Sequence, residues 1–415
     1  MSDYNKSRPL IMHIDLNSCF ATVEQQARPL LRGRPVAIVN RRTEHTSIVT
    51  ASYEAKSMGV GLGMRLRDAQ KICPGLVGLE SDPPKYKFVY RQLMRIMNDY
   101  SAHVRMKSID EGVIDFGEAT GAMQERDLVE IGHEIKRRLW SEIGVAMNCN
   151  IGIGTNRFMA KTAASLHKPN GLDVITHENI REVFAGLELT DLNGIAGRME
   201  RRLNAVGIFT PLEFLDASEE ALRLQVFKSI EGTSWHKRLR GWEVDKRDFD
   251  LKSAGRQYVL SEYKMPRAKV LKRLHHLCEE VGQKVRSQSL VARGVRVHAR
   301  GYHHEGNGWG GKYWQARHMA SLPFFSDQAI YEHAKLLFQD APVFVKEIGV
   351  TCYELSKSED KQMSIFGDEL ARSRATTIAV DEINNRYGRR TIHSADTLGI
   401  GMTGPKIPFG STRYL

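Results

Sequence analysis

The chain lacks any apolar run long enough to cross a membrane. Its first apolar run, at residues 10–14, is far shorter than the roughly 20 residues of a membrane-spanning helix and too short for the core of a signal peptide. Internal repeats and low-complexity tracts are also missing. These absences argue against a membrane-bound, exported or repeat protein, and we expect a cytoplasmic location.

Cysteine is scarce, with five residues in a chain of 415 and no CxxC pair. The absence of such pairs excludes a zinc ribbon and a CxxC redox motif, and an odd, scattered set fits a reducing cytosol. The pairs His275–His276 and His303–His304 have no cysteine at zinc-ligand spacing. We therefore expect surface histidines at both places.

Positive charge is abundant, with a formal net charge of +11 and a pI of about 9.3. This balance favours a polyanionic partner, and without a membrane segment that partner is nucleic acid. Residues 251–357 contain 17 lysines and arginines against nine acids, a net charge of +8. This stretch predicts a DNA-binding module, although a solvated surface is an equal alternative.

The length predicts two to four domains at roughly 150 residues each. Strands interleaved with helices up to about residue 175 predict an α/β unit, with a small subdomain inserted at residues 19–82. The stretch HVRMKSIDEGVIDF predicts two strands that meet at a tight turn near Gly112. FMAKTAASLH predicts a helix that the KPNG turn ends.

The second half of the chain changes character. Residues 176–250 are helical in pattern, and residues 251–357 predict a small α+β module. This module begins with a basic linker, KSAGRQYVL, and continues with a helix whose apolar residues are spaced 3-4-3-4. Strands follow at VARGVRVHAR and VKEIGVTCYEL. The tail from residue 358 is polar, and we expect the segment SKSEDKQMSIFGDELARSR to be flexible.

Three carboxylates are placed where they could share a metal ion. Asp15 ends the first predicted strand, and Asp110 and Glu111 are adjacent at a predicted turn. Carboxylates brought together repel one another unless cations neutralise them, and hard oxygen ligands favour Mg²⁺. Two such ions about 4 Å apart can activate a 3′-hydroxyl and stabilise a pyrophosphate leaving group. Ordinary acids at turns are the alternative.

Other residues could bind phosphate. TASYEAKSMGV contains Thr50, Tyr53 and Lys56 at a turn that enters a helix, and Lys161 lies on the FMAKTAA helix. Each signal is weak alone, because a single lysine is usually solvated. GTNRFMAKT is not a P-loop, since it has one residue too many and Ala160 in place of the glycine.

Four segments together resemble the Y-family translesion DNA polymerases: HIDLNSCFATVE, TASYEAKSMGV, SIDEGVIDF and GTNRFMAKTAASLHKPNG. They occur in the order and at the spacings of that family, and the resemblance extends to about residue 366. It implies a right-hand polymerase of α/β and α+β domains. The implied parts are palm (8–18 and 83–175), fingers (19–82), helical thumb (176–250), little finger (251–357) and a tail with a clamp-binding motif (358–415).

The resemblance also assigns roles to single residues. It implies metal ligation by Asp15, Asp110, Glu111 and the carbonyl of Leu16. It makes Phe20 the steric gate that stacks under the sugar. It implies triphosphate contacts by Thr50, Tyr53, Lys56 and Lys161. Asn17 and Lys56 are similar to the polymerase V branch, whereas KPNG and AKTAA are more similar to polymerase IV.

Two segments are expected to bind DNA outside the active site. GIAGRMERRL resembles a helix-hairpin-helix, in which Gly194 and Gly197 would let backbone N–H groups approach phosphate. A plain turn with glycine caps is an equal alternative. Arg256 in the basic linker is a further candidate for DNA contact.

The apolar island QMSIF, within an otherwise polar stretch, resembles the bacterial sliding-clamp binding motif. Ile365 and Phe366 would enter an apolar pocket of the clamp, and Gln362 would hydrogen-bond at its rim. Packing of this segment onto the little finger is the alternative.

These features predict low-fidelity, template-directed DNA synthesis across damaged DNA. The substrates are primer–template DNA and deoxynucleoside triphosphates, the cofactor is two Mg²⁺ ions, and the enzyme is expected to be a monomer tethered to the sliding clamp. The sequence contains no second cluster of carboxylates that would supply a proofreading exonuclease. The alternatives are a catalytically inactive, Y-family-like DNA-binding adaptor and a generic nucleic-acid-binding protein.

Overall fold

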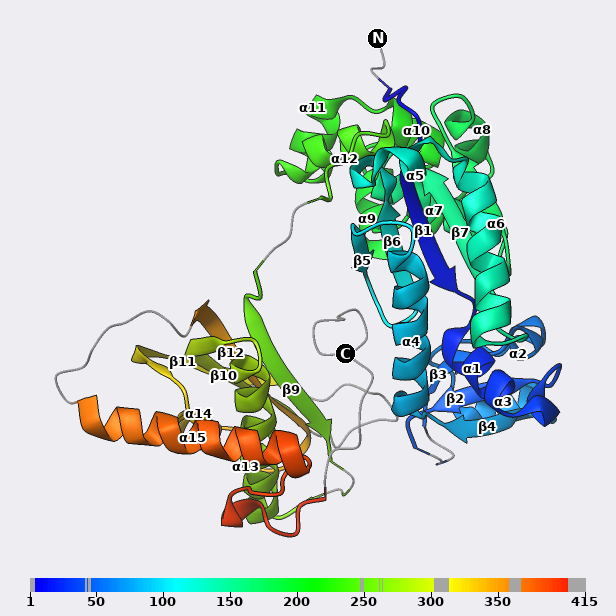
Figure 1. The fold of residues 1–415 in the computed structure, drawn as a ribbon. Helices are drawn as coiled ribbons and strands as arrows, with labels where there is room; N and C mark the ends of the chain where they lie inside the picture. The colour runs from blue at the N-terminus through cyan, green and yellow to red at the C-terminus, as the bar shows by residue number, and fades with distance from the viewer. Residues whose placement is uncertain are drawn as a thin grey trace. The chain divides into compact units, whose positions relative to one another are not determined.

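The computed structural model describes residues 4–401 except 42, 44–45, 247–249, 261, 263, 302–312 and 358–366. The chain forms two compact units, one up to Arg247 and a second from Asp248 to Thr403 (Figure 1). Within the described ranges, no helix combines the length and the apolar character that a membrane crossing requires.

A five-stranded sheet in the order β5-β6-β1-β7-β8 is the centre of the first unit. The strands are β5 (Val104–Met106), β6 (Glu111–Asp115), β1 (Ile11–Leu16), β7 (Cys149–Gly154) and β8 (Leu172–Ile175). The two strands predicted to meet at a tight turn near Gly112 are β5 and β6, which pair antiparallel, and Gly112 itself is the second residue of β6. The chain reverses over residues 107–110, just before β6, where the N–H groups of Lys107 and Ser108 donate to the Glu111 carbonyl.

Side-chain alternation on β1 separates the two layers that cover this sheet. Met12 and Ile14 belong to the core that includes α4 (Pro83–Asn98) and α6 (Leu128–Arg138). Ile11 packs against α7 (Arg157–Leu166) on the opposite face. Since successive residues of a strand point to opposite faces, Asp15 also lies on the α7 face.

Glycines in β7 bring α7 close to the sheet. A Cβ atom at Gly152 would lie 2.0 Å from the Ala160 carbonyl oxygen, and one at Gly154 would lie 2.7 Å from the Ala160 nitrogen. No other residue fits at these distances. The side chains of α7 therefore reach the strand ends of β1 and β6.

A second, three-stranded sheet in the order β3-β2-β4 has its own small core. Its elements are β2 (Val36–Val39), β3 (Ile48–Ala51), β4 (Val77–Glu80), α2 (Tyr53–Ser57) and α3 (Leu66–Ile72). The preceding helix α1 (Cys19–Ala27) packs in the main core of the five-stranded sheet. The small sheet is thus inserted between β1 and β5, as predicted, but α1 supports the larger sheet.

The end of the first unit is helical, as the sequence predicts. Its elements are α8 (Ile180–Ala185), η4 (Leu189–Asp191), α9 (Gly197–Asn204), α10 (Pro211–Asp216), α11 (Glu219–Ala221), η5 (Leu222–Val226) and α12 (Glu231–Leu239). Their shared core contains Phe184, Phe214 and Trp235. The remaining short elements of this unit are η1 (Pro29–Leu31), η2 (Phe116–Glu118), α5 (Gly121–Glu125) and η3 (Leu139–Ile143).

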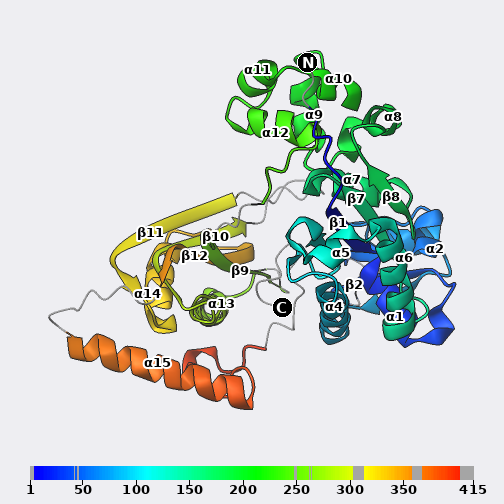
Figure 2. The same cartoon turned by 45° about the horizontal axis from the view of Figure 1, so that its top comes forward.

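The second unit contains a four-stranded antiparallel sheet in the order β11-β10-β12-β9. Its elements are β9 (Ser253–Val259), α13 (Arg267–Arg286), β10 (Leu290–Gly301), β11 (Tyr313–Phe324), α14 (Asp327–Phe338) and β12 (Val345–Lys357). Figure 2 shows α13 and α14 on the same side of this sheet. The predicted basic linker is wrong, because KSAGRQYVL contributes the edge strand β9.

The second unit continues beyond the predicted boundary at residue 357. Helix α15 (Gly367–Tyr387) and the turn η6 (Ala395–Thr397) belong to it. Arg286 of α13 pairs with Asp381 of α15 at 2.6 Å, and Arg390 pairs with Glu279 of α13 at 2.6 Å. The expectation of flexibility is therefore wrong for residues 367–374, which belong to α15, and charge pairs hold the described part of the tail to α13.

The histidines of α13 are part of this packing. His275 and His276 are 1 % and 2 % exposed, so the expectation of surface histidines is wrong there. His275 stacks on Tyr331 with ring centroids 3.8 Å apart. Residues 303–304 lie outside the described residues.

Candidate active site

The three predicted carboxylates come together at one end of the five-stranded sheet. Asp15 and Glu111 are register partners on the antiparallel strands β1 and β6. Asp110 precedes Glu111, and its carbonyl accepts a hydrogen bond from the Leu16 N–H at 2.9 Å. Two distant segments of the chain thus place three acids side by side.

Glu111 is held by a histidine and a lysine. Lys161 of α7 donates to its two oxygens at 2.8 and 3.0 Å, and His13 Nε2 lies 3.2 Å from Oε2. Burial alone would raise the pKa of Glu111, but the hydrogen bonds from His13 and Lys161 outweigh burial and lower the pKa to about 2. Glu111 is therefore ionised at neutral pH.

The pKa of Asp110 shows that placing the three acids close together is electrostatically unfavourable. Burial raises the pKa of Asp110, and the negative charges of Asp15 and Glu111 raise it further, against the hydrogen bond from Ser108. A bound cation would relieve both effects. The three carboxylates are hard oxygen donors, which is the chemistry that Mg²⁺ prefers.

Lysines neutralise two of the three acids in this structure. Lys168 of the KPNG turn pairs with Asp15, and Lys161 pairs with Glu111. Within the part of the chain that the structure describes, no three Asp, Glu, His or Cys side chains are grouped so that they could hold a metal ion. The three carboxylates are the kind of donor that a divalent cation prefers, but in this structure Asp15 and Glu111 pair with lysines and Asp110 accepts a hydrogen bond from Ser108.

Three of the four predicted triphosphate residues, Tyr53, Lys56 and Lys161, interact with the carboxylates. Tyr53 begins α2, and Lys56 Nζ lies 4.6 Å from its ring centroid and 2.8 Å from Ser18 Oγ. Burial lowers the pKa of Lys56, and the positive charge of Lys168 lowers it further. Thr50 is a half-buried residue of β3, the strand that precedes α2. Helix α2 has five residues and is capped by Ser52, so its N-terminus adds little attraction for phosphate.

Asn17 connects the two sides of the site and was not predicted as a site residue. Its Oδ1 accepts from the Asn170 N–H at 2.9 Å, and its Nδ2 donates to Asn150 at 2.7 Å and to Tyr53 at 3.3 Å. These bonds hold the KPNG turn, and with it Lys168, next to Asp15.

His13 and Lys168 are two further site residues that the sequence analysis does not identify. The two-residue spacing of His13 and Asp15 on one strand was the available signal for the histidine.

Phe20 occupies the first turn of α1, next to the strand that carries Asp15. Its ring is 4 % exposed and stacks on Tyr86 of α4, with ring centroids 4.6 Å apart. Most of the ring is thus covered by the protein.

The predicted DNA-contact residues lie in both units of the chain. Gly194 has a φ of +95°, and Gly197 is the first residue of α9. Arg256 pairs with Glu280 of α13 at 3.4 Å, so its side chain lies on the helix-covered face of the sheet. The opposite face carries exposed arginines, since Arg296 and Arg317 are register partners and Arg300 lies four residues further along β10, on the same face. Gln362, Ile365 and Phe366 lie outside the described residues.

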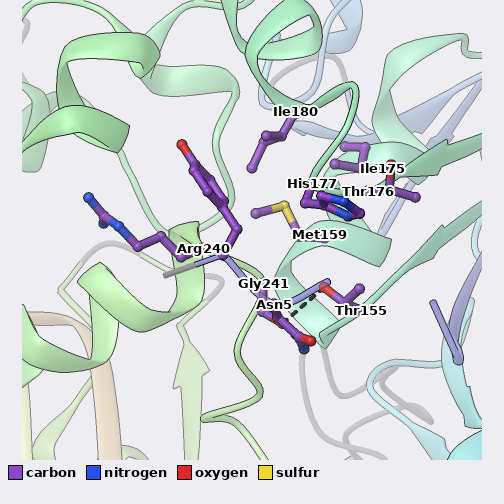
Figure 3. A pocket seen from close by; sticks show the side chains of 10 residues that line it. Asn5, Thr155, Met159, Ile175, Thr176, His177, Ile180, Arg240 and Gly241 are labelled. Carbon is purple, nitrogen blue, oxygen red and sulfur yellow. Dashed lines mark hydrogen bonds between the residues drawn. The ribbon is translucent and has the colours of Figure 1, made fainter. Parts of the chain in front are cut away.

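A small pocket of the first unit lies away from the carboxylates (Figure 3). Its lining includes Met159, His177 and Arg240 and contains no acid. The side chains of Asn5 and Thr155 both donate to the Gly241 carbonyl, at 3.0 and 2.9 Å. These bonds fasten the end of the helical part to β7, so the pocket belongs to a structural junction.

Two parts of the chain match the two domain models of one protein family. Residues 14–165 match the impB/mucB/samB family, and residues 252–365 match the C-terminal domain of the same family. The chain is 31 % identical to DNA polymerase IV of Moorella thermoacetica over 97 % of this chain and 98 % of that protein. It is 28 % identical to DNA polymerase IV 1 of Bacillus subtilis over 95 % of this chain and 94 % of the relative.

Solved structures show the same fold. A Y-family DNA polymerase chimera of Dbh and Dpo4 matches with a TM-score of 0.70 and 23 % identity, covering 84 % of this chain and 99 % of the chimera. An insertion ternary complex of Dbh DNA polymerase matches with a TM-score of 0.56 and 22 % identity, covering 83 % of this chain and 98 % of the other.

Proposed function

Since this chain belongs to the Y family of translesion DNA polymerases, it is a DNA-directed DNA polymerase, and we propose that its reaction takes place at Asp15, Asp110 and Glu111. The observation that carries this proposal is the meeting of the three acids at the ends of β1 and β6, where Asp15 and Glu111 are register partners. The alternative of an inactive adaptor is not favoured, because all three acids are present and the relatives are polymerases.

The proposed cofactor is two Mg²⁺ ions, held by the three carboxylates and the Leu16 carbonyl. Bound there, the ions would lower the pKa of the primer 3′-hydroxyl and neutralise charge on the leaving pyrophosphate. The protein contributes a fixed donor set: His13 orients Glu111, and the β1–β6 pairing orients Asp15. Polymerases of this family are metal-dependent nucleotidyltransferases, which agrees with this arrangement.

The lysines beside the acids would bind the triphosphate. Lys56 and Lys161 match the predicted phosphate contacts, and Lys168 adds a third positive charge close to both Asp15 and Lys56. A cluster of cations next to a cluster of anions suits a substrate that arrives as a triphosphate with its metal ions. Lysine provides a point charge and lacks the fork of arginine, so the grip on phosphate is less directional.

We propose Phe20 as the group that excludes ribonucleotides. Phe20→Ala should raise kcat/KM for ribonucleotide insertion by about 100-fold, because the site would no longer reject a 2′-hydroxyl on steric grounds. Single-nucleotide insertion kinetics with matched deoxy- and ribonucleotides measure this change. Val23→Ala is the control, since Val23 is a buried residue of the same helix and is 4 % exposed. An unchanged sugar preference in Phe20→Ala would remove Phe20 from this role.

The second unit is proposed as the main DNA-binding surface. Its open sheet face carries Arg296, Arg300 and Arg317, while helices α13 and α14 cover the other face. Phosphate contacts from such a face hold DNA without reading its sequence, which suits an enzyme that copies damaged template.

The small three-stranded subdomain would enclose the nascent base pair loosely, and this lowers fidelity. We further propose that the enzyme is monomeric and cytoplasmic.

We propose that QMSIF tethers the enzyme to the bacterial sliding clamp. Ile365→Ala with Phe366→Ala should abolish binding to the clamp and clamp-stimulated synthesis, because these side chains would fill the apolar pocket. Titration of a QMSIF-containing peptide against a clamp measures the first effect, and primer extension with and without the clamp measures the second. Synthesis without the clamp serves as the control and should not change. Equal stimulation of wild type and double variant would contradict the tethering role.

A further inference from the structure

The side of Phe20 that faces the protein interior rests on a second aromatic ring. Tyr86 of α4 stacks on Phe20 with ring centroids 4.6 Å apart and planes 17° apart. Tyr86 is fully buried at 0 % exposure, and both rings belong to the main core. Residues 66 positions apart in the sequence therefore form one stack next to the carboxylates.

Tyr86 is itself anchored by a buried acid. Its hydroxyl donates to Glu24 Oε1 at 3.2 Å, and Glu24 is 0 % exposed. Lys85 and Arg28 neutralise Glu24, with nitrogen–oxygen distances of 2.9 and 3.4 Å to Oε2. Burial raises the pKa of Tyr86, and the negative charge of Glu24 raises it as well, so the hydroxyl stays a donor.

The anchoring of Tyr86 matters because the Phe20 ring can exclude a ribose 2′-hydroxyl only if the ring stays in place. A ring that can retreat into a soft core lets the larger sugar enter, whereas a ring fixed by packing makes the clash costly. Glu24 lies one helical turn after Phe20 on α1 and binds the tyrosine that supports Phe20 from α4. The hydrogen bond and the stack thus join the two helices at the ring that meets the sugar.

We infer that Tyr86, held by Glu24, is a positioning residue that keeps Phe20 rigid and so sets the selectivity between deoxyribose and ribose. This inference rests on the proposed role of Phe20. Tyr86 acts through the Phe20 ring and makes no contact of its own with the nucleotide.

The test is the ratio of kcat/KM for a deoxynucleotide to kcat/KM for the matching ribonucleotide. Tyr86→Leu removes the stack and should lower this ratio about tenfold, through faster ribonucleotide insertion, while deoxynucleotide insertion changes less than about threefold. Tyr86→Phe keeps the ring and loses only the anchor to Glu24, and should lower the ratio about threefold. In the Phe20→Ala background, Tyr86→Leu should add nothing, because a residue that acts through Phe20 has no effect without it.

Leu93→Ala controls for general loss of stability, since Leu93 is a fully buried residue of the same helix and the same core. It should lower Tm without changing the sugar ratio. The inference is overturned if Tyr86→Leu leaves the ratio within about twofold of wild type while Phe20→Ala collapses it. If Tyr86→Leu does not fold, an unchanged ratio in Tyr86→Phe overturns the inference equally. An unchanged ratio in Phe20→Ala would instead remove the proposed role of Phe20 itself.

Discussion

Asp110→Ala should lower the rate of nucleotide incorporation by about 10⁴-fold, since it removes a ligand that the reaction cannot replace. Duplex affinity should stay within about twofold of wild type, because the phosphate contacts lie elsewhere. Single-turnover primer extension measures the rate, and fluorescence anisotropy of labelled primer–template measures the affinity. A variant that extends primers at near the wild-type rate would show that the reaction takes place at another site.

A matched control and a readout without catalysis make this result specific. Asp99→Ala removes an acid that pairs with Arg138 at the end of α4, away from the site, and should leave the rate within about twofold of wild type. Mg²⁺ should raise the Tm of wild type, because a ligand of the folded state stabilises it, and should not raise the Tm of Asp110→Ala. Equal stabilisation of both proteins would contradict metal binding at Asp110.

Removing the arginines of the open face of the second unit should produce the second large effect. The triple substitution of Arg296, Arg300 and Arg317 by alanine should weaken duplex binding about 100-fold or more at low salt. The slope of log K against log salt should fall by about 2.7, because each phosphate contact contributes about 0.9 to it. Binding titrations at several salt concentrations measure both quantities. Unchanged slope and affinity would mean that this positive charge is only solvated surface.

Arg256→Ala is the matched control for the triple variant. Arg256 lies in the same sheet, but it pairs with Glu280 of α13 on the opposite face. Its loss should leave the salt slope unchanged. Deletion of the whole second unit, residues 248–403, should flatten the slope at least as much as the triple variant, since it also removes the three arginines. A deletion that keeps the wild-type slope would assign DNA binding to the first unit.

Several elements of the fold could be predicted because their information is local. The apolar residues of β1 and the FMAKTAASLH helix predict one strand and one helix, and the structure has β1 and α7 there. The sequence of the edge strand β9 predicts a linker, because it is polar and basic and has little apolar alternation. Its hydrogen bonds come from β12, almost a hundred residues later, and a sequence window does not contain that partner.

The candidate site, like the fold, combines features that are local in the sequence with contacts between distant segments. The sequence by itself determined which chemistry is available, because HIDLN, TASYEAK and SIDEG contain the acids and cations to which the resemblance to the Y family assigns metal and phosphate contacts. Only the tertiary structure decided their partners. It paired Lys168 with Asp15, placed Arg256 on the helix-covered face, and set Tyr86 against Phe20. The reason is physical: charge and ring contacts depend on distances of a few ångströms between residues far apart in the chain, and packing alone sets those distances.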